Sequence, residues 1–395
     1  MIGPFTIARL PRIIFGEGSV AQLPDCVRRS GERTLLVTGA RSLQQSEHWP
    51  ALLRAFEQRG ITWAQLSVSG EPSPQLVDQA VAAYKDDRIE VVVGIGGGSV
   101  LDAAKAIAGL LRVGDSVTDY LEGVGTGRVY QGPAVPFIAV PTTAGTGSEA
   151  TRNAVLSVQG ADGFKKSFRD EQLVPEYALV DPALLAACPP ELIAANGMDA
   201  LTQLIESYVS LRANAFTDAL ARSGIEAARD GLLDWYERGA AAHDARSRMA
   251  YAALISGITL AQTGLGSVHG LASPLGAFFP IPHGVVCGTL VAAATQVNID
   301  VMQQREPDNP ALAKYAELGE ILCKRSFSHA ETAREALVML LTEWTEQLQL
   351  PRLGAFNVEE SDYPRIVTNS RGSSMRTNPV MLADADIERI LLARG

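Results

Sequence analysis

The sequence predicts an N-terminal α/β domain with a mostly parallel sheet, followed by an all-helical C-terminal domain. Three observations lead to this prediction. Short apolar, β-branched runs alternate with stretches of helical spacing in the first half, which is typical of parallel sheets covered by helices. From Pro189 onward, helical periodicity dominates. The chain has 395 residues, enough for two domains, and we predict a boundary between 1–185 and 186–395.

The elements of the first half alternate as such a fold requires. Ser73 followed by Pro74 marks the start of one helix, and Gly39 and Pro141 end two of the strands. The predicted strands are 6–15, 34–38, 62–68, 91–95, 135–140 and 178–181, and the predicted helices are 19–30, 49–59, 73–84 and one from about residue 100. In the second half we predict helices at 191–211, 213–233, 245–260, 285–297, 309–324, 330–348 and 384–393.

The composition excludes several classes of protein. A formal net charge of −10 offers no basic surface for nucleic acid or an anionic membrane. No run of about 18 uncharged apolar residues suggests a membrane span, and the N-terminus lacks the basic-then-apolar order of a signal peptide. The cysteines are far apart and form no C-x-x-C pair, so we expect reduced thiols in the cytoplasm rather than disulfides or a thiolate zinc site. They are Cys26, Cys188, Cys287 and Cys323.

A glycine loop between a buried strand and a helix is the strongest local motif. Gly96–Ser99 follow the β-branched run, and an alanine-rich helical pattern begins near Val100. Glycines permit positive φ angles and the close approach of a phosphate, while a helix N-terminus offers free N–H groups. We predict a phosphate cradle here; a tight turn without a ligand is the alternative. A second loop, 141–149, also follows a strand, and its hydroxyls suit ribose, phosphate or carboxamide contacts.

Two histidines and two polar residues of a predicted helix form a candidate metal site. Asp199 and Gln203 are four residues apart, so a helix places both on one face. An exposed polar face of the helix, without a metal, is the alternative explanation of this spacing. His269 and His283 lie in an apolar stretch whose prolines prevent one straight helix and allow the two side chains to converge. With Asp199 they would form a two-histidine, one-carboxylate site suited to Fe²⁺ or Zn²⁺. Two structural histidines are the alternative.

Several long motifs occur in a fixed order along the chain. They are IIFGEGSVAQL (13–23), GGGSVLDAAKAIA (96–108), PTTAGTGSEAT (141–151), LVPEYALVDPALL (173–185), GMDAL (197–201), HGLASPLGAFFPIPHG (269–284) and NPVMLADADIERIL (378–391). In this order they resemble the iron-containing (group III) alcohol dehydrogenase family over nearly the whole chain. The resemblance implies a dehydroquinate synthase-like fold, with a dinucleotide-binding domain and a helical metal and substrate domain. It also implies reversible NAD- or NADP-dependent oxidation of an alcohol to an aldehyde or ketone in an interdomain cleft, by a homodimer or larger homo-oligomer.

The resemblance also assigns roles to single residues. It places the pyrophosphate on the glycine loop, Asp102 near the nicotinamide and Lys165 near its ribose. Asp199, His269 and His283 would hold a metal that acts as a Lewis acid on the substrate oxygen while hydride passes to or from the nicotinamide. The cofactor residues that the resemblance implies are Gly39, Gly96, Gly97, Gly98, Ser99, Asp102, Thr142, Thr143, Thr151 and Lys165.

Two departures from the family pattern concern the metal and the substrate. Most members have histidine where Gln203 stands, and an amide oxygen is a poorer ligand than imidazole, so we expect weaker binding or a different metal. The histidine that usually precedes a proline beside the substrate is here Ser273, which changes the proton relay and the substrate preference. The predicted metal ligands are Asp199, Gln203, His269 and His283, and the predicted catalytic residues are Asp199, His269, His283 and Ser273.

A third departure concerns the choice of cofactor. Members strict for NAD often carry an aspartate at the end of the first cofactor strand, where this chain has Gly39, with Arg41 two residues on. Without that carboxylate, we expect NADP(H) to be tolerated or preferred. Two enzyme classes on the same scaffold remain alternatives: a metal-independent reductase like maleylacetate reductase, and a lyase like dehydroquinate synthase.

Overall fold

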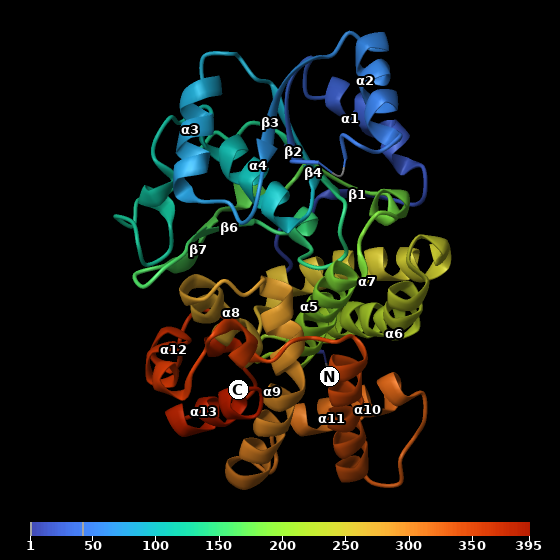
Figure 1. Ribbon diagram of the computed structural model, residues 1–395, viewed down its shortest axis with the longest axis vertical. Helices are drawn as coiled ribbons and strands as arrows, with labels where there is room; N and C mark the ends of the chain where they lie inside the picture. The colour runs from blue at the N-terminus through green and yellow to red at the C-terminus, as the bar shows by residue number, and fades with distance from the viewer. Residues whose placement is uncertain (1, 42) are drawn as a thin grey trace. The chain divides into compact units, whose positions relative to one another are not determined.

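The computed structural model describes residues 2–41 and 43–395, and these divide into two compact units. We call Ala8–Val158 with Lys165–Cys188 the sheet unit. The helical unit contains Pro189–Gly395, the segment Gln159–Phe164 and the N-terminal segment that ends at Ile7. A parallel sheet in one unit and helices in the other confirm the predicted fold class (Figure 1).

Six strands of the described chain form one parallel sheet, in the order β1-β8-β5-β4-β2-β3. Every residue of β4 is buried, as expected for a central strand that is apolar on both faces. Because β4 lies between β2 and β5, their carboxyl ends, at Gly39, Gly96 and Pro141, meet at one edge of the sheet. The strands are β1 (Arg12–Phe15), β2 (Arg33–Gly39), β3 (Thr62–Val68), β4 (Val91–Gly96), β5 (Phe137–Pro141) and β8 (Tyr177–Val180).

Helices pack on both faces of this sheet. Leu23, Val27 and Phe56 of α1 and α2 form one buried cluster with Val93 and other strand residues. The α4 helix packs on the other face of β4 and β5, against the strand residues that alternate with those of the cluster. Ser73 caps α3 by accepting a hydrogen bond from Leu76 N, as the sequence predicts for this start. The bounds are α1 (Leu23–Arg28), α2 (His48–Gln58), α3 (Pro74–Tyr84) and α4 (Gly98–Leu110).

A separate two-stranded sheet, β6 (Asn153–Val158) and β7 (Phe164–Arg169), follows β5 and is absent from the sequence prediction. The apolar run of β6 is only three residues long, Ala154–Leu156, and β7 carries two lysines and a serine between its phenylalanines, so neither strand was predicted. The turn that joins them belongs to the helical unit, where Gly160 N donates to Ala277 O at 3.1 Å. The N-terminal segment also belongs there, because Phe5 stacks on Phe216 with ring centroids 6.4 Å apart.

The helical unit is built around α5 and α9, which pack against each other and are buried over most of their length. Sequence periodicity predicts most of these helices but not α8, which contains Pro274, or α12, which has only seven residues. The helices are α5 (Pro190–Val209), α6 (Ala215–Arg238), α7 (His243–Thr263), α8 (Ser267–Phe278), α9 (His283–Arg305), α10 (Ala311–Cys323), α11 (Ala330–Gln347), α12 (Tyr363–Asn369) and α13 (Asp384–Leu392).

Among the described helices, α9 alone is long and apolar enough to cross a membrane by length and composition. Its apolar window is 78% buried inside the fold, against α5, α8 and α11. The apolar character of α9 is therefore explained by its place in the core of the helical unit.

Candidate functional site

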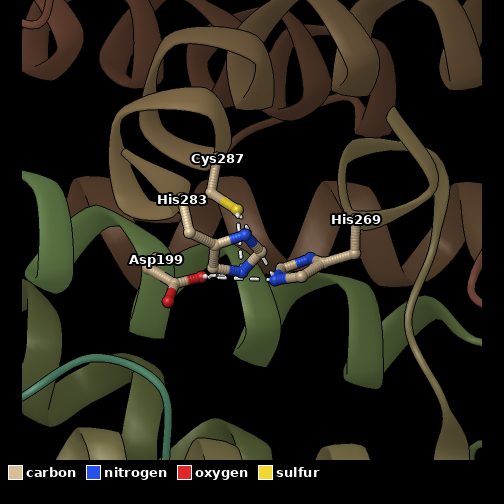
Figure 2. Close-up of side chains that lie close together, drawn as sticks. All are labelled: Asp199, His269, His283 and Cys287. Atoms are coloured by element: carbon tan, nitrogen blue, oxygen red, sulfur yellow. Dashed lines mark hydrogen bonds and ion pairs between the residues drawn. The ribbon is translucent and has the colours of Figure 1, made fainter. Parts of the chain in front are cut away.

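Three of the four predicted metal ligands converge at one point of the helical unit. Asp199 comes from α5, His269 from α8, and His283 from the first position of α9 (Figure 2). The extended residues around Pro280 and Pro282 separate α8 from α9, so the chain turns between the two histidines as their sequence spacing predicts. The sequence analysis missed a further member, Cys287. Its thiol, one helical turn after His283, faces the same point (Figure 2).

The donor atoms of this cluster lie within 4.8 Å of one another. Asp199 Oδ1 is 3.2 Å from His269 Nε2 and 3.8 Å from His283 Nε2. Cys287 Sγ is 3.6 Å from His269 Nε2 and 3.8 Å from His283 Nε2. The other carboxylate oxygen, Asp199 Oδ2, is buried and has no hydrogen-bond partner among the described residues. A buried carboxylate oxygen beside imidazole and thiol donors fits a divalent metal ion.

Glu206 fixes the orientation of one of these histidines. Its Oε2 is 2.7 Å from Nδ1 of His269, and its Oε1 accepts a hydrogen bond from Val268 N at 2.7 Å. Nε2 of His269 therefore points toward Asp199, as in metal sites where a carboxylate holds the far nitrogen of the ligand. The sequence analysis did not identify Glu206. The signal was present, because Glu206 lies seven residues after Asp199 and two helical turns place both on one face.

Burial opposes the charged forms of the side chains in this cluster, and the neighbouring groups determine the final direction of the pKa shifts of Asp199 and His269. Burial by itself would raise the pKa of Asp199, but the charge of His283 and the hydrogen bond from His269 lower it. Burial by itself would lower the pKa of His269, but Cys287, Glu206 and Asp199 raise it well above the usual value. Burial raises the pKa of the Cys287 thiol to about 12. A cation that enters this cluster must therefore displace protons from His269 and from any thiol that binds it.

The structure places the two remaining residues of this predicted site as follows. Gln203 lies on the buried face of α5, and its Oε1 accepts a hydrogen bond from Ser256 Oγ of α7 at 2.7 Å. Ser273 is partly buried on α8, four residues after His269 and therefore on the same face.

In the sheet unit, the glycine loop joins β4 to α4 as predicted, but the glycines serve close packing and not unusual backbone angles. None of Gly96, Gly97 and Gly98 in the described loop has a positive φ, which corrects one part of the sequence argument. A Cβ atom on Gly96 would lie 2.5 Å from Val100 Cγ2, and one on Gly98 would lie 2.6 Å from Thr146 Cγ2. No described side chain caps α4, so its first N–H groups are available to an anion.

A buried polar network lies beneath the loop. Asp102 accepts hydrogen bonds from Ser148 Oγ and Val155 N, and its pKa is raised because it is buried. The fully buried Lys105 donates to Thr151 Oγ1 at 2.9 Å and lies 3.9 Å from Asp102. The other acceptors around its ammonium group are Ser148 O, Ser148 Oγ and Asn153 O. This network ties α4 to the loop 141–149 and its continuation at Thr151.

Burial shifts the pKa values of Lys105 and of its neighbour Glu149 toward neutral pH. Burial lowers the pKa of Lys105 to about 8, although Asp102 and Glu149 oppose the shift. Burial raises the pKa of Glu149 to about 7. The hydroxyl of Thr151, predicted to contact the cofactor, lies within hydrogen-bond distance of Lys105 in this network.

The other predicted cofactor residues also lie in the sheet unit. Thr142 N donates to Gly96 O at 2.9 Å, and Thr143 stands against Gly97, so both threonines border the glycine loop. Gly39 ends β2, beside β4 in the sheet, and Arg41 beyond it is exposed. Lys165 on β7 pairs with Glu71, with Nζ 2.6 Å from Oε1.

Two family models match the chain, one after the other. Iron-containing alcohol dehydrogenase matches residues 11–182, and the Fe-containing alcohol dehydrogenase family, C-terminal, matches residues 193–394. The chain belongs to the iron-containing alcohol dehydrogenase family. Membership makes this enzyme an oxidoreductase that interconverts alcohols with aldehydes or ketones by means of a nicotinamide cofactor.

Individual relatives agree with this family. Alcohol dehydrogenase 4 of Saccharomyces cerevisiae (strain YJM789) is 31% identical over 96% of this chain and 96% of its own length. Lactaldehyde reductase of Escherichia coli (strain K12) is 31% identical over 89% of each. The crystal structure of sulfoacetaldehyde reductase from Bifidobacterium kashiwanohense in complex with NAD⁺ superimposes with a TM-score of 0.85, at 26% identity and 99% coverage of both chains. This reductase therefore shares the fold over nearly the whole chain.

Proposed function

We propose that this enzyme interconverts a small alcohol and its carbonyl compound at a divalent cation held by Asp199, His269 and His283. The observation that carries the proposal is the convergence of these side chains on the buried Asp199 carboxylate, whose Oδ2 lacks a hydrogen-bond partner among the described residues. A buried carboxylate is costly unless its oxygens are satisfied, and a cation would satisfy this one. Fe²⁺ and Zn²⁺ both accept these donor types.

The residues of the cluster have different tasks in this proposal. A bound cation supplies Lewis acidity toward the substrate oxygen, which lowers the pKa of the alcohol. Asp199 contributes negative charge, and His269 contributes a nitrogen that Glu206 keeps in orientation. Ser273, one helical turn after His269, offers a hydroxyl that can hydrogen-bond the substrate oxygen.

The cofactor is proposed to lie on the sheet unit, with its pyrophosphate at Gly96–Ser99. The uncapped N-terminus of α4 supports this placement, because its N–H groups and dipole favour an anion. Asp102 would lie near the nicotinamide and Lys165 near its ribose, and Thr142, Thr143 and Thr151 would make further contacts with the cofactor. The lactaldehyde and sulfoacetaldehyde reductases among the relatives support small polar aldehydes as the substrate class.

Metal removal tests the proposed function. We expect chelation to abolish turnover of short-chain alcohols, and Zn²⁺ or Fe²⁺ to restore it, because the polarising charge is lost with the ion. Asp199→Ala and His269→Ala should bind less than one metal ion per chain by elemental analysis. His329→Ala, at an exposed position before α11, is the matched control and should keep both metal and activity. Full turnover by metal-free protein would reject the proposal and favour a metal-independent reductase.

We also propose that the enzyme accepts NADP(H). Gly39 at the end of β2 supports this, because it offers no carboxylate to repel a 2′-phosphate, and the exposed Arg41 follows. The kcat/KM values with NADH and NADPH should lie within about 100-fold of each other. Gly39→Asp should lower kcat/KM for NADPH by more than about tenfold and leave NADH turnover nearly unchanged. A larger preference of the unmodified enzyme for NADH would contradict this proposal.

The cellular setting and assembly complete the proposal. We place the enzyme in the cytoplasm, which is supported by the absence of disulfide bonds among the described cysteines Cys26, Cys188, Cys287 and Cys323. A homodimer or larger homo-oligomer rests on the family resemblance alone.

A further inference from the structure

Cys287 occupies a position that the sequence pattern assigns to no ligand. Its thiol is fully buried, and Sγ lies 3.6 Å from His269 Nε2 and 3.8 Å from His283 Nε2. Because Cys287 follows His283 by four residues on α9, both side chains lie on one face of the same helix. The chain thus brings a soft donor, anionic once its proton is displaced by a metal, to the cluster from an element that already supplies one ligand.

The separations between the donors agree with one common cation. Zinc binds nitrogen and oxygen at about 2.0–2.2 Å and sulfur at about 2.3 Å, and a tetrahedron with such bonds has donors about 3.3–3.7 Å apart. Four of the six pairwise separations, 3.2, 3.6, 3.8 and 3.8 Å, lie close to that range, and all six are within 4.8 Å. The thiol of Cys287 therefore lies within reach of a metal shared with Asp199, His269 and His283.

The residue predicted to be the fourth ligand is less suited to this task. The Oε1 atom of Gln203 already pairs with Ser256 Oγ at 2.7 Å, and a neutral amide oxygen is a weak ligand for zinc or iron(II). Charge gives the same preference. Asp199 and a Cys287 thiolate would balance a divalent cation between two neutral imidazoles, whereas Gln203 would leave one positive charge uncompensated in a buried site.

We propose that Cys287 is the fourth protein ligand in place of Gln203, and that its thiolate shifts the metal preference of this site from iron toward zinc. This inference rests on the metal-assisted function proposed above. It gives the replacement of a family histidine at position 203 a physical explanation, since a donor from α9 takes over the role of one from α5. It also reverses our expectation from the cysteine spacing, which excluded a thiolate metal site.

Cobalt substitution tests this ligand directly. Protein loaded with one Co²⁺ per chain should show a near-ultraviolet thiolate-to-cobalt charge-transfer band, and Cys287→Ser should abolish it. Cys323→Ser is the matched control, because that thiol ends α10 and bonds Ala336 O instead of the cluster. Gln203→Ala should keep both the band and the 1:1 stoichiometry. In zinc-loaded, unmodified enzyme, X-ray absorption should detect one sulfur at about 2.3 Å, a measurement that needs no variant.

The outcomes separate this inference from the function on which it rests. Three outcomes would overturn the thiolate ligand alone. The unmodified enzyme could bind one cobalt per chain without showing the band, or the band could survive in Cys287→Ser. Alternatively, Gln203→Ala could lose the metal while Cys287→Ser retains it. Failure of the unmodified enzyme to bind cobalt or zinc would overturn both. Metal competition gives a further check, since Cys287→Ser should lose at least about tenfold more affinity for Zn²⁺ than for Fe²⁺.

Discussion

Asp199 and Glu149 are both buried carboxyl groups, but their pKa values are shifted in opposite directions. Asp199 faces two imidazoles, whose charge and hydrogen bonds lower its pKa despite burial. Glu149 has Lys105 as its charged neighbour, and burial raises its pKa to about 7. A buried carboxyl group is expensive to ionise without close partners. The first group is therefore ready to bind a cation at neutral pH, while the second makes stability depend on pH.

The raised pKa of Glu149 predicts a loss of stability between about pH 4.5 and 7. Below pH 4.5 this side chain is protonated in both states; above it, the unfolded chain loses the proton first, so folding becomes less favourable until about pH 7. Lys105 keeps its proton in both states over this range, because its own pKa is about 8 when folded. At about 1.4 kcal/mol per pKa unit, the loss from Glu149 is about 3 kcal/mol.

Glu149→Gln should remove most of this loss. We expect the urea-unfolding free energy of the variant, relative to the unmodified protein, to rise by about 2–3 kcal/mol between pH 4.5 and 7.5. Glu57→Gln, at an exposed position on α2, should follow the unmodified protein at both pH values. Parallel pH curves for Glu149→Gln and the unmodified protein would contradict a neutral, buried Glu149.

The residues that sequence reasoning found and missed differ in the kind of signal they carry. Asp199, His269 and His283 stood out because histidine is rare in this chain and the prolines between the two histidines imply a turn. Cys287 and Glu206 escaped because cysteine spacing was compared only with other cysteines, and a glutamate on a helix usually faces water. Their helical offsets from His283 and Asp199 become informative only after the first ligands are placed.

At the scale of elements, the β4–α4 connection depends on the absence of side chains. A Cβ on Gly96 would lie within 2.8 Å of three Val100 atoms, including the branched Cβ that rotation cannot move away. Gly39, at the end of the neighbouring strand, has its nearest potential contact at 4.0 Å. The two glycines thus occupy similar places at strand ends but have different packing around them.

Gly96→Ala should therefore destabilise the sheet unit by about 1–3 kcal/mol, since the first turn of α4 must move away from β4. It should also weaken NAD(H) binding, because the same turn carries the N–H groups proposed to bind the pyrophosphate. Gly39→Ala should change stability by less than about 0.5 kcal/mol. Urea unfolding and cofactor titration measure both effects, and equal stability of the two variants would rule out the packing argument.

The sequence predicted helices and strands correctly where the periodicity of apolar residues was strong, and missed them where the local sequence signals were weak or conflicting. The buried strands and long helices have clear apolar runs or helical spacing, so they are found where predicted, although β1 begins only at Arg12 and α9 continues to Arg305. The β6–β7 pair has only a three-residue apolar run, in β6, and α8 combines helical spacing with an internal proline. Tertiary packing stabilises these elements where the local sequence does not specify them. The β6 strand packs against α4, and α8 packs against α9 and α12.

At the scale of the whole molecule, the proposed metal ligands all belong to the helical unit. A ligand that binds only the folded form stabilises by about 2.7 kcal/mol at 100 times its dissociation constant. Metal removal should therefore speed hydrogen exchange of the slowest amides of α5 and α9 by up to about 100-fold, while β2 and β4 of the sheet unit keep their rates. Mass spectrometry of peptic peptides measures this difference, and equal acceleration in both units would contradict it.

The discontinuity of the helical unit affects how the polypeptide can be dissected. A fragment that begins after residue 188 would lack Phe5, which covers the ring of Phe216, and the hairpin tip that bonds Ala277 through Gly160. The complementary fragment would carry both pieces without the helices they pack against. Each half would therefore lose contacts that belong to the intact helical unit, and a truncation series or a split-protein reporter should restore these two short peptides to the helical bundle.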